Sequence, residues 1–230
     1  MPDLGRFRGI GRANGGETHK PTDPEAIFRR APKRQDSFPD LWRGQTDALR
    51  GWNARRTQPD VLITLNTGAG KTVVGNLIAQ SLVNEGRRNV VYACGTIDLI
   101  KQTEKEAHRL GLEPTLRTHG TFSDNRFETG DTFCITTYQA LYHPFSPFQK
   151  TLQPEAMIFD DAHTSEGYLR DAFTFTVEKK RFPEAYSELA KLAESAFQQI
   201  NRGESLRNIL NARLISFSFP LTTFTRRANR

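Results

Sequence analysis

The chain has 230 residues and a net charge of +6, with 37% apolar and 25% charged residues. This composition is typical of a globular chain with one full domain and extensions, and no apolar run approaches the roughly 20 residues of a membrane-spanning helix. Cys94 and Cys134 both lie in apolar runs. We expect buried thiols in a reducing, cytoplasmic compartment, rather than a disulfide or a zinc site. The positive charge is compatible with polyanionic partners and does not by itself select one.

The N-terminal segment differs in composition from the rest of the chain. Residues 1–37 are rich in Gly, Pro, Arg and Lys and have little periodic apolar content. Such a segment cannot bury enough apolar surface to offset the entropy of ordering. We therefore expect a flexible basic segment that can form a short helical turn at 24–30.

From residue 38 onward, apolar runs alternate with helical periodicity. Strands are predicted at 61–65, 89–94, 133–136 and 156–159. Helices are predicted at 39–52, at 71–84, at 97–110 with Thr96 as its cap, and in a short segment from Tyr138. Strands separated by helices, without tight hairpin turns, indicate an α/β domain over 38–165 with a mostly parallel sheet and helices on both faces.

The alternation of predicted strands and helices becomes less regular in the C-terminal part of the chain. We expect a mainly helical extension over 166–230 that ends in an irregular basic tail. Its elements are predicted as helices at 165–172 and 183–200 and a half-buried strand at 173–177.

The most informative run is L-N-T-G-A-G-K-T at 65–72, between a predicted strand and a predicted helix. Glycines let such a loop approach a polyphosphate closely, and the helix that follows directs its N–H groups at the anion. Lys71 is expected to reach the β- and γ-phosphates, and the Thr72 hydroxyl to bind Mg²⁺. The residues expected to hold the nucleotide phosphates are Thr67, Gly68, Ala69, Gly70, Lys71 and Thr72.

The loop departs from the strict pattern in its first residue, because Leu65 stands where Gly is usual. The alternative interpretation is a glycine-containing turn followed by a surface lysine. The flanking strand and helix favour the phosphate loop over that alternative.

A second polar cluster, Asp160-Asp161-Ala162-His163, follows the predicted strand at 156–159. Ligands of open parallel sheets bind beyond the carboxyl ends of the strands, so these acids and the glycine loop are expected at one edge. Asp160 would then hold Mg²⁺, and Asp161 would orient or deprotonate the attacking water. The alternative is a strand-end turn with solvated acids.

In this order, the motifs resemble the first RecA-like lobe of superfamily 2 helicases and translocases, the DEAD/DEAH-box group. The resemblance covers residues from about 38 to 165 and implies a three-layer P-loop domain that binds ATP and Mg²⁺. It also includes L-W-R-G-Q at 41–45, G-T at 95–96 and T-T-Y-Q-A-L at 136–141. By this resemblance Gln45 reads adenine, Thr96 and Thr136 contact the backbone of DNA or RNA, and His163 couples the nucleotide site to a second lobe.

Several of these residues have structural alternatives, which carry equal weight for the two threonines. Thr96 and Thr136 can act as simple helix caps. Tyr138 can stack on a base or lie in the core, and the core is the preferred interpretation. His163 can merely fill space.

The chain departs from the family pattern in two respects. The second acid of the acidic motif is usually Glu, and Asp161 is shorter by one methylene, so we expect slow turnover and a higher rate for Asp161→Glu. The Ser/Thr-Ala-Thr motif and the second lobe with its arginine fingers do not occur before Arg230. We therefore expect a fragment, a truncated product or one part of a split enzyme that needs a second lobe or chain.

Three functions are compatible with these motifs. The first is the ATP-binding lobe of a nucleic-acid-dependent ATPase, a helicase-type hydrolase acting on single-stranded nucleic acid or a duplex being translocated. The second is a P-loop phosphotransferase whose lid would use Arg181, Arg202, Arg207 and Arg213. The third is a non-catalytic module that binds nucleotide or nucleic acid without turnover.

Overall fold

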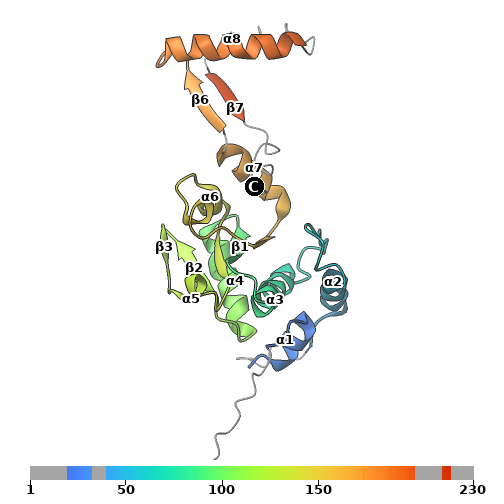
Figure 1. Ribbon diagram of the computed structural model, residues 1–230. Coiled ribbons are helices and arrows are strands. Elements are labelled where there is room, and N and C mark those ends of the chain that lie inside the picture. The colour runs from blue at the N-terminus through green and yellow to red at the C-terminus, as the bar shows by residue number, and fades with distance from the viewer. Residues whose placement is uncertain (1–19, 33–39, 173, 200–213, 219–230) are drawn as a thin grey trace, which may run out of the picture.

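The computed structural model describes residues 20–32, 40–172, 174–199 and 214–218 (Figure 1). Its main sheet has five strands in the order β3-β2-β4-β1-β5. The strands are β1 (Val90–Cys94), β2 (Thr115–Thr118), β3 (Thr121–Phe122), β4 (Cys134–Thr137) and β5 (Ala156–Phe159). All neighbours are parallel except β2 and β3. Ala93 of β1 is in register with Thr136 of β4 and Phe159 of β5, so these three strands end at the same edge.

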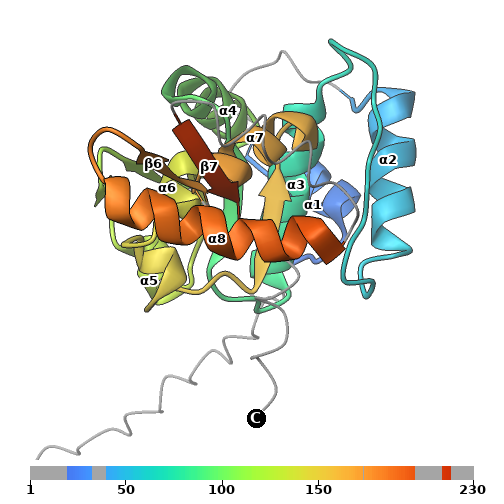
Figure 2. The ribbon, with the colours of Figure 1, turned by 90° about the horizontal axis from the view of Figure 1, so that it is seen from above.

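Helices cover both faces of the sheet, which gives the predicted three-layer, RecA-like α/β architecture (Figure 2). Alternate residues of β1 divide between the two sides, because successive side chains of a strand point to opposite faces. Tyr92 lies in the core cluster with α2 (Arg43–Asn53), α3 (Lys71–Asn84) and α4 (Ile97–Arg109). Val91 and Ala93 lie in the opposite cluster, which includes residues of α5 (Arg126–Thr129), α6 (Tyr138–Tyr142) and the 3₁₀ turn η1 (Pro147–Gln149).

The packed body begins earlier than the boundary expected at residue 38. Helix α1 (Pro24–Arg30) forms where a short helical turn is predicted, with the Asp23 side chain accepting from Glu25 N at 3.2 Å. Ile27 and Phe28 are each only 4% exposed and join the same core as α3. Residues 20–32 are therefore part of the folded body, and the rest of the predicted flexible segment lies outside the described residues.

The strand predicted at 61–65 is not formed. The segment belongs to neither sheet, although its burial alternates as the sequence indicates: Val61, Ile63 and Leu65 pack against the core, while Leu62 is 84% exposed. Alternation describes the faces of an extended segment, whereas a strand also needs a neighbour that completes its backbone hydrogen bonds. In this structure β5 is the last strand on that side.

The C-terminal extension contains more strand than expected. Helix α7 (Ala162–Ala172) is followed by β6 (Thr174–Glu178), α8 (Pro183–Gln199) and β7 (Leu214–Ser218), and β6 pairs with β7 in an antiparallel two-stranded sheet. Figure 1 shows this sheet and α8 beyond α7 at one end of the molecule. The tail predicted to be irregular from 216 thus begins within β7, and residues 219–230 lie outside the described part.

Both cysteines are free and fully buried, as predicted. Burial raises the pKa of the Cys94 thiol to about 12, which keeps it protonated and unreactive at neutral pH. Across the described ranges, no helix has the length and apolar character required to traverse a bilayer.

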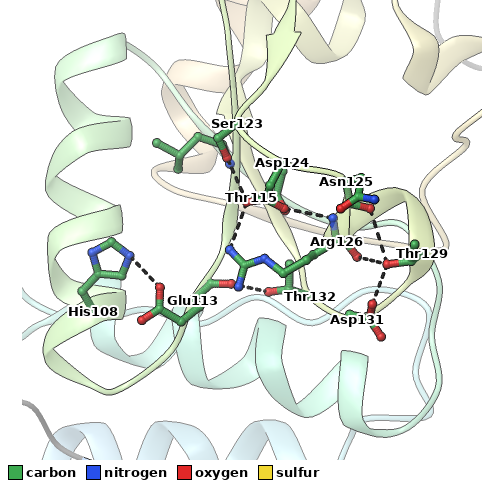
Figure 3. A network of polar contacts seen from close by, with 11 residues as sticks. His108, Glu113, Thr115, Ser123, Asp124, Asn125, Arg126, Thr129, Asp131 and Thr132 are labelled. Atoms are coloured by element: carbon green, nitrogen blue, oxygen red, sulfur yellow. Dashed lines mark hydrogen bonds and ion pairs between the residues drawn. The ribbon is translucent and has the colours of Figure 1, made fainter.

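A polar network joins β2 to α5, two elements that the sequence analysis did not predict (Figure 3). The Asp124 carboxylate accepts hydrogen bonds from Thr115 Oγ1 at 2.6 Å, from Arg126 N at 2.9 Å and from Arg126 Nη2 at 3.0 Å. These bonds hold the carboxyl pKa well below its usual range, with the Arg126 side chain as the largest cause. One carboxylate thus fixes the path of the chain between β3 and α5.

We predict that Asp124→Asn lowers the free energy of unfolding at pH 7 by about 1–3 kcal/mol, because charge-assisted hydrogen bonds are lost. The folded-state pKa is depressed, so the stabilisation is present above about pH 4 and is lost as the pH falls toward the folded-state pKa. Urea titrations at several pH values measure the difference. Glu128→Gln on the exposed surface of α5 is the control, and equal losses in the two variants would contradict the prediction.

Candidate functional site

The glycine loop leads directly into α3. Gly68 and Gly70 have φ angles of 80° and 74°, in the left-handed region that glycine adopts readily. Gly70 is the N-cap of α3, and no side chain caps this helix. The positive end of the helix dipole and its first N–H groups are therefore available to an anion at Lys71 and Thr72.

Gly70 is required for a second reason, which is the close approach of Gln45. A Cβ atom at Gly70 would lie 2.2 Å from Gln45 Nε2, far inside a permitted contact. The Gln45 side chain is buried, and its Nε2 donates to the Ala69 carbonyl oxygen at 3.2 Å. Its Oε1 accepts from Trp42 N at 3.0 Å. The amide therefore ties the start of α2 to the phosphate loop, and adenine recognition by Gln45 stays a prediction that requires these bonds to be exchanged.

The acidic turn lies where β5 ends. Asp160 N donates to the Ala93 carbonyl oxygen at 3.0 Å, which extends the pairing of β5 with β1 by one residue. Asp161 has a φ angle of 60°, and α7 begins at the next residue. Among L-residues, Asp and Asn tolerate this left-handed conformation best. The backbone therefore favours Asp over Glu at this position, which weakens the expectation that Asp161→Glu raises turnover.

The charge of Lys71 acts on Asp160. Burial raises the pKa of the Asp160 carboxyl most, and the negative charge of Asp161 raises it further. The positive charge of Lys71 and a hydrogen bond from the Tyr92 side chain act in the opposite direction. Lys71 and Asp160, far apart in the sequence, are therefore near enough in the folded chain for the lysine charge to favour ionisation of the carboxyl group.

Two tyrosines that contact the acidic turn were not predicted as site residues. Tyr92 of β1 is 1% exposed and hydrogen-bonds the Asp160 side chain. Tyr138, the first residue of α6, is fully buried, and its hydroxyl donates to the Asp160 carbonyl oxygen. The preference for a core position at Tyr138 is confirmed, but its hydroxyl also serves the site.

The close approach of a bulky side chain to α3, which proves to be that of Tyr92, could have been inferred from Gly75. This glycine interrupts an otherwise apolar stretch of the helix. Gly within a helix costs up to about 1 kcal/mol relative to Ala and often marks a close approach. A Cβ atom at Gly75 would lie 2.5 Å from Tyr92 Cε2 and 2.9 Å from its hydroxyl oxygen. The glycine thus creates the space through which the ring reaches Asp160.

The two threonines proposed to contact nucleic acid lie in different environments. Thr96 is exposed, and its Oγ1 caps α4 by accepting from Leu99 N at 3.2 Å. Thr136 is fully buried, and its hydroxyl donates to the Arg117 carbonyl oxygen at 3.1 Å, so it does not face solvent. The neighbouring Thr137 caps α6 through Ala140 N at 3.1 Å. His163 is exposed in the first turn of α7, and its coupling role stays a prediction.

The fold and this arrangement define an ATP-binding lobe of helicase superfamily 2, the first of the two RecA-like lobes. Residues 39–201 match the family described as type III restriction enzyme, res subunit. Because the match covers more than half of the chain, the chain belongs to this family. Membership implies binding of ATP, usually with Mg²⁺, and of nucleic acid. No curated protein matches the chain.

We predict that Gly75→Ala lowers the free energy of unfolding by about 1–2 kcal/mol, although Ala is the better helix former. The new methyl group collides with a buried aromatic ring, and overpacking of this kind costs about 1–3 kcal/mol. Urea unfolding followed by circular dichroism measures the change.

Gly167→Ala is the matched control for that substitution. Gly167 lies inside α7, and a Cβ atom there meets nothing within 4 Å. This variant is expected to gain up to about 1 kcal/mol from helix propensity. A gain of stability in Gly75→Ala as well would show that Tyr92 does not occupy the space above Gly75.

Proposed function

We propose that this chain is the ATP-binding lobe of a nucleic-acid-dependent ATPase of the helicase or translocase type. The reaction is hydrolysis of ATP to ADP and phosphate, and we propose that a second lobe or chain completes the site. The observation that carries the proposal is the placement of both motifs around β1: α3, which the glycine loop begins, packs on Tyr92, and Asp160 N donates to the Ala93 carbonyl oxygen. The charge of Lys71 also acts to lower the pKa of Asp160. A surface lysine and solvated acids, the alternative interpretation, would not be placed together in this way.

The donor set around the acidic turn fits Mg²⁺. This ion prefers oxygen ligands and is usually held by one or two protein groups together with phosphates and water. The Asp160 carboxylate and the Thr72 hydroxyl at the start of α3 would supply such groups. Bound Mg²⁺ would neutralise charge on the β- and γ-phosphates during transfer to water.

In this proposal the remaining side chains have distinct tasks. Lys71 holds the γ-phosphate, and the loop from Thr67 to Gly70 cradles the phosphates with its backbone. Asp161, exposed next to Asp160, orients the attacking water and accepts its proton. His163, in the first turn of α7, would pass the state of the site to a second lobe.

The nucleic-acid site is proposed at the ends of β1 and β4, where α4 and α6 begin. Exposed Thr96 is the candidate phosphate contact at α4. Thr137 takes the place of the buried Thr136 at α6, since Thr137 is the residue at the helix start. Contacts of this kind read the sugar–phosphate backbone, and their affinity falls with salt.

A non-catalytic binding module is the second candidate, and Asp161 is the observation that favours it. Its side chain is shorter than the usual Glu, and a small displacement of a catalytic base can cost on the order of 100-fold in rate. For the phosphotransferase alternative, Arg181 is exposed after β6, and Arg202, Arg207 and Arg213 lie outside the described residues. No observation on the described residues favours such a lid.

We predict that Lys71→Ala raises the dissociation constant for a fluorescent ATP analogue in the presence of Mg²⁺ by roughly 10- to 100-fold, because charge-assisted hydrogen bonds to phosphate are lost. Fluorescence titration of the full chain measures the change. Lys105→Ala, an exposed position on α4, is the control for loss of positive charge. Unaltered nucleotide affinity in Lys71→Ala would eliminate the proposal.

We predict that Asp161→Asn retains ATP affinity but lowers phosphate release about 100-fold or more, because a general base is removed. Asn keeps the volume of Asp and tolerates the left-handed backbone, so the turn should persist. Phosphate release is measured with saturating ATP, Mg²⁺ and single-stranded nucleic acid. An unchanged rate would exclude Asp161 as the base, and no release from the parent chain even with its second lobe supplied would favour the non-catalytic module.

A further inference from the structure

Tyr138 lies between two parts of the proposed site. It directly follows Thr137, the residue that caps α6 at the proposed nucleic-acid edge. Its hydroxyl donates to the Asp160 carbonyl oxygen and lies 3.4 Å from the Asp161 carbonyl oxygen. A single rigid side chain thus connects the start of α6 to the backbone of both acids.

The ring of Tyr138 has little freedom to move away from the turn. Its centroid lies 6.0 Å from that of Phe159 at the end of β5, and 5.6 Å from that of Tyr168 in α7. The residue is fully buried. A displacement of α6 is therefore passed to the acidic turn through packed rings and a hydrogen bond, rather than absorbed by side-chain rotation.

The acidic turn itself needs support from outside. Asp161 is in the left-handed region, which is unfavourable for most L-residues and persists where neighbours hold it. Within α7, Thr164 N and Oγ1 donate to the Asp161 carbonyl oxygen at 3.1 Å and 2.9 Å. Tyr138 makes the corresponding bond from α6 to Asp160, and its hydroxyl also lies within hydrogen-bond distance of the Asp161 carbonyl oxygen. The acidic turn is thus held from α7, from β1 through Ala93, and from the start of α6 through Tyr138.

We propose that Tyr138 is a positioning residue that couples nucleic-acid binding at the start of α6 to the geometry of Asp160 and Asp161. The inference rests on the proposed function. It adds a path of coupling between the two ligand sites that lies within one lobe. Binding of a phosphate backbone at Thr137 shifts or fixes α6. The Tyr138 hydroxyl carries this change to the carbonyl of Asp160, and so to the carboxylates of the acidic turn.

The test is the linkage between two ligands, which requires no hydrolysis. The dissociation constant of the full chain for a fluorescent single-stranded oligonucleotide is measured with and without a non-hydrolysable ATP analogue and Mg²⁺. If the sites are coupled, the two constants differ, typically by about 5- to 150-fold. Tyr138→Phe removes only the hydroxyl, and we expect the ratio to fall to about 1 while the affinity for each ligand alone changes less than about threefold.

Two variants serve as controls. Tyr142→Phe removes a half-buried hydroxyl at the other end of α6 and should keep the parental ratio. Ser165→Ala removes the hydrogen bond from Ser165 Oγ to the Ala162 carbonyl oxygen in the first turn of α7, which does not involve Tyr138, and should also keep the parental ratio. If Tyr138→Phe does not fold, urea titration reveals this, and Tyr138→Trp, which keeps a ring and moves the donor, takes its place with the same expected loss of coupling.

The outcomes separate the inference from the function on which it rests. A parental ratio in Tyr138→Phe would overturn the inference, as would an equal loss of coupling in Ser165→Ala, since general loosening at the start of α7 would then explain both. ATP binding without any coupling in the parent chain would overturn the inference and leave the ATP-binding lobe intact. Absence of Lys71-dependent ATP binding would overturn both.

Discussion

The constraint on which the site depends is a partly buried carboxylate at the carboxyl edge of a parallel sheet. Asp160 loses hydration at the end of β5 and has a second acid beside it. Both effects oppose ionisation, and within the described ranges the charge of Lys71 and the hydroxyl of Tyr92 favour it. A site with two acids and one lysine is best stabilised by a further cation, because unpaired charge is costly away from water. This requirement is the physical reason for proposing Mg²⁺ between the phosphate loop and the acidic turn.

The packing around α3 and α6 determines how accurately those charges are placed. Gly70 at the N-cap of α3 and Gly75 within it lie where a Cβ atom would strike Gln45 or Tyr92, so the helix is fitted between two neighbouring side chains. Tyr138 completes the arrangement from the other face of the sheet. Because close-packed interiors do not deform continuously, motion at one of these contacts is transmitted to the others. The positions of the two acidic side chains therefore depend on all the residues that pack at this edge of the sheet.

Much of the fold follows from local patterns in the sequence. Helix α3 spans the residues predicted for it, because a glycine loop begins it and Gly86 ends it, and β5 has its predicted bounds because an apolar run stops at two acids. The cap at Thr96 was predicted for the same local reason. The short elements β2 and α5 carry too few residues to show a period, and their placement depends on the polar network around Asp124.

The tertiary structure decided what depends on partners distant in the sequence. The segment at 61–65 alternates correctly yet forms no strand, because a strand requires a neighbour's backbone. The hydroxyls of Tyr92 and Tyr138 serve the acidic turn only because parallel pairing places β1 between β4 and β5, with the ends of all three strands at one edge, and the same pairing buries Thr136. The sequence by itself determined the residue types and the periodicity of the elements, which are local. Which side chains meet at the edge was decided by sheet order and packing, because these are long-range properties of the folded chain.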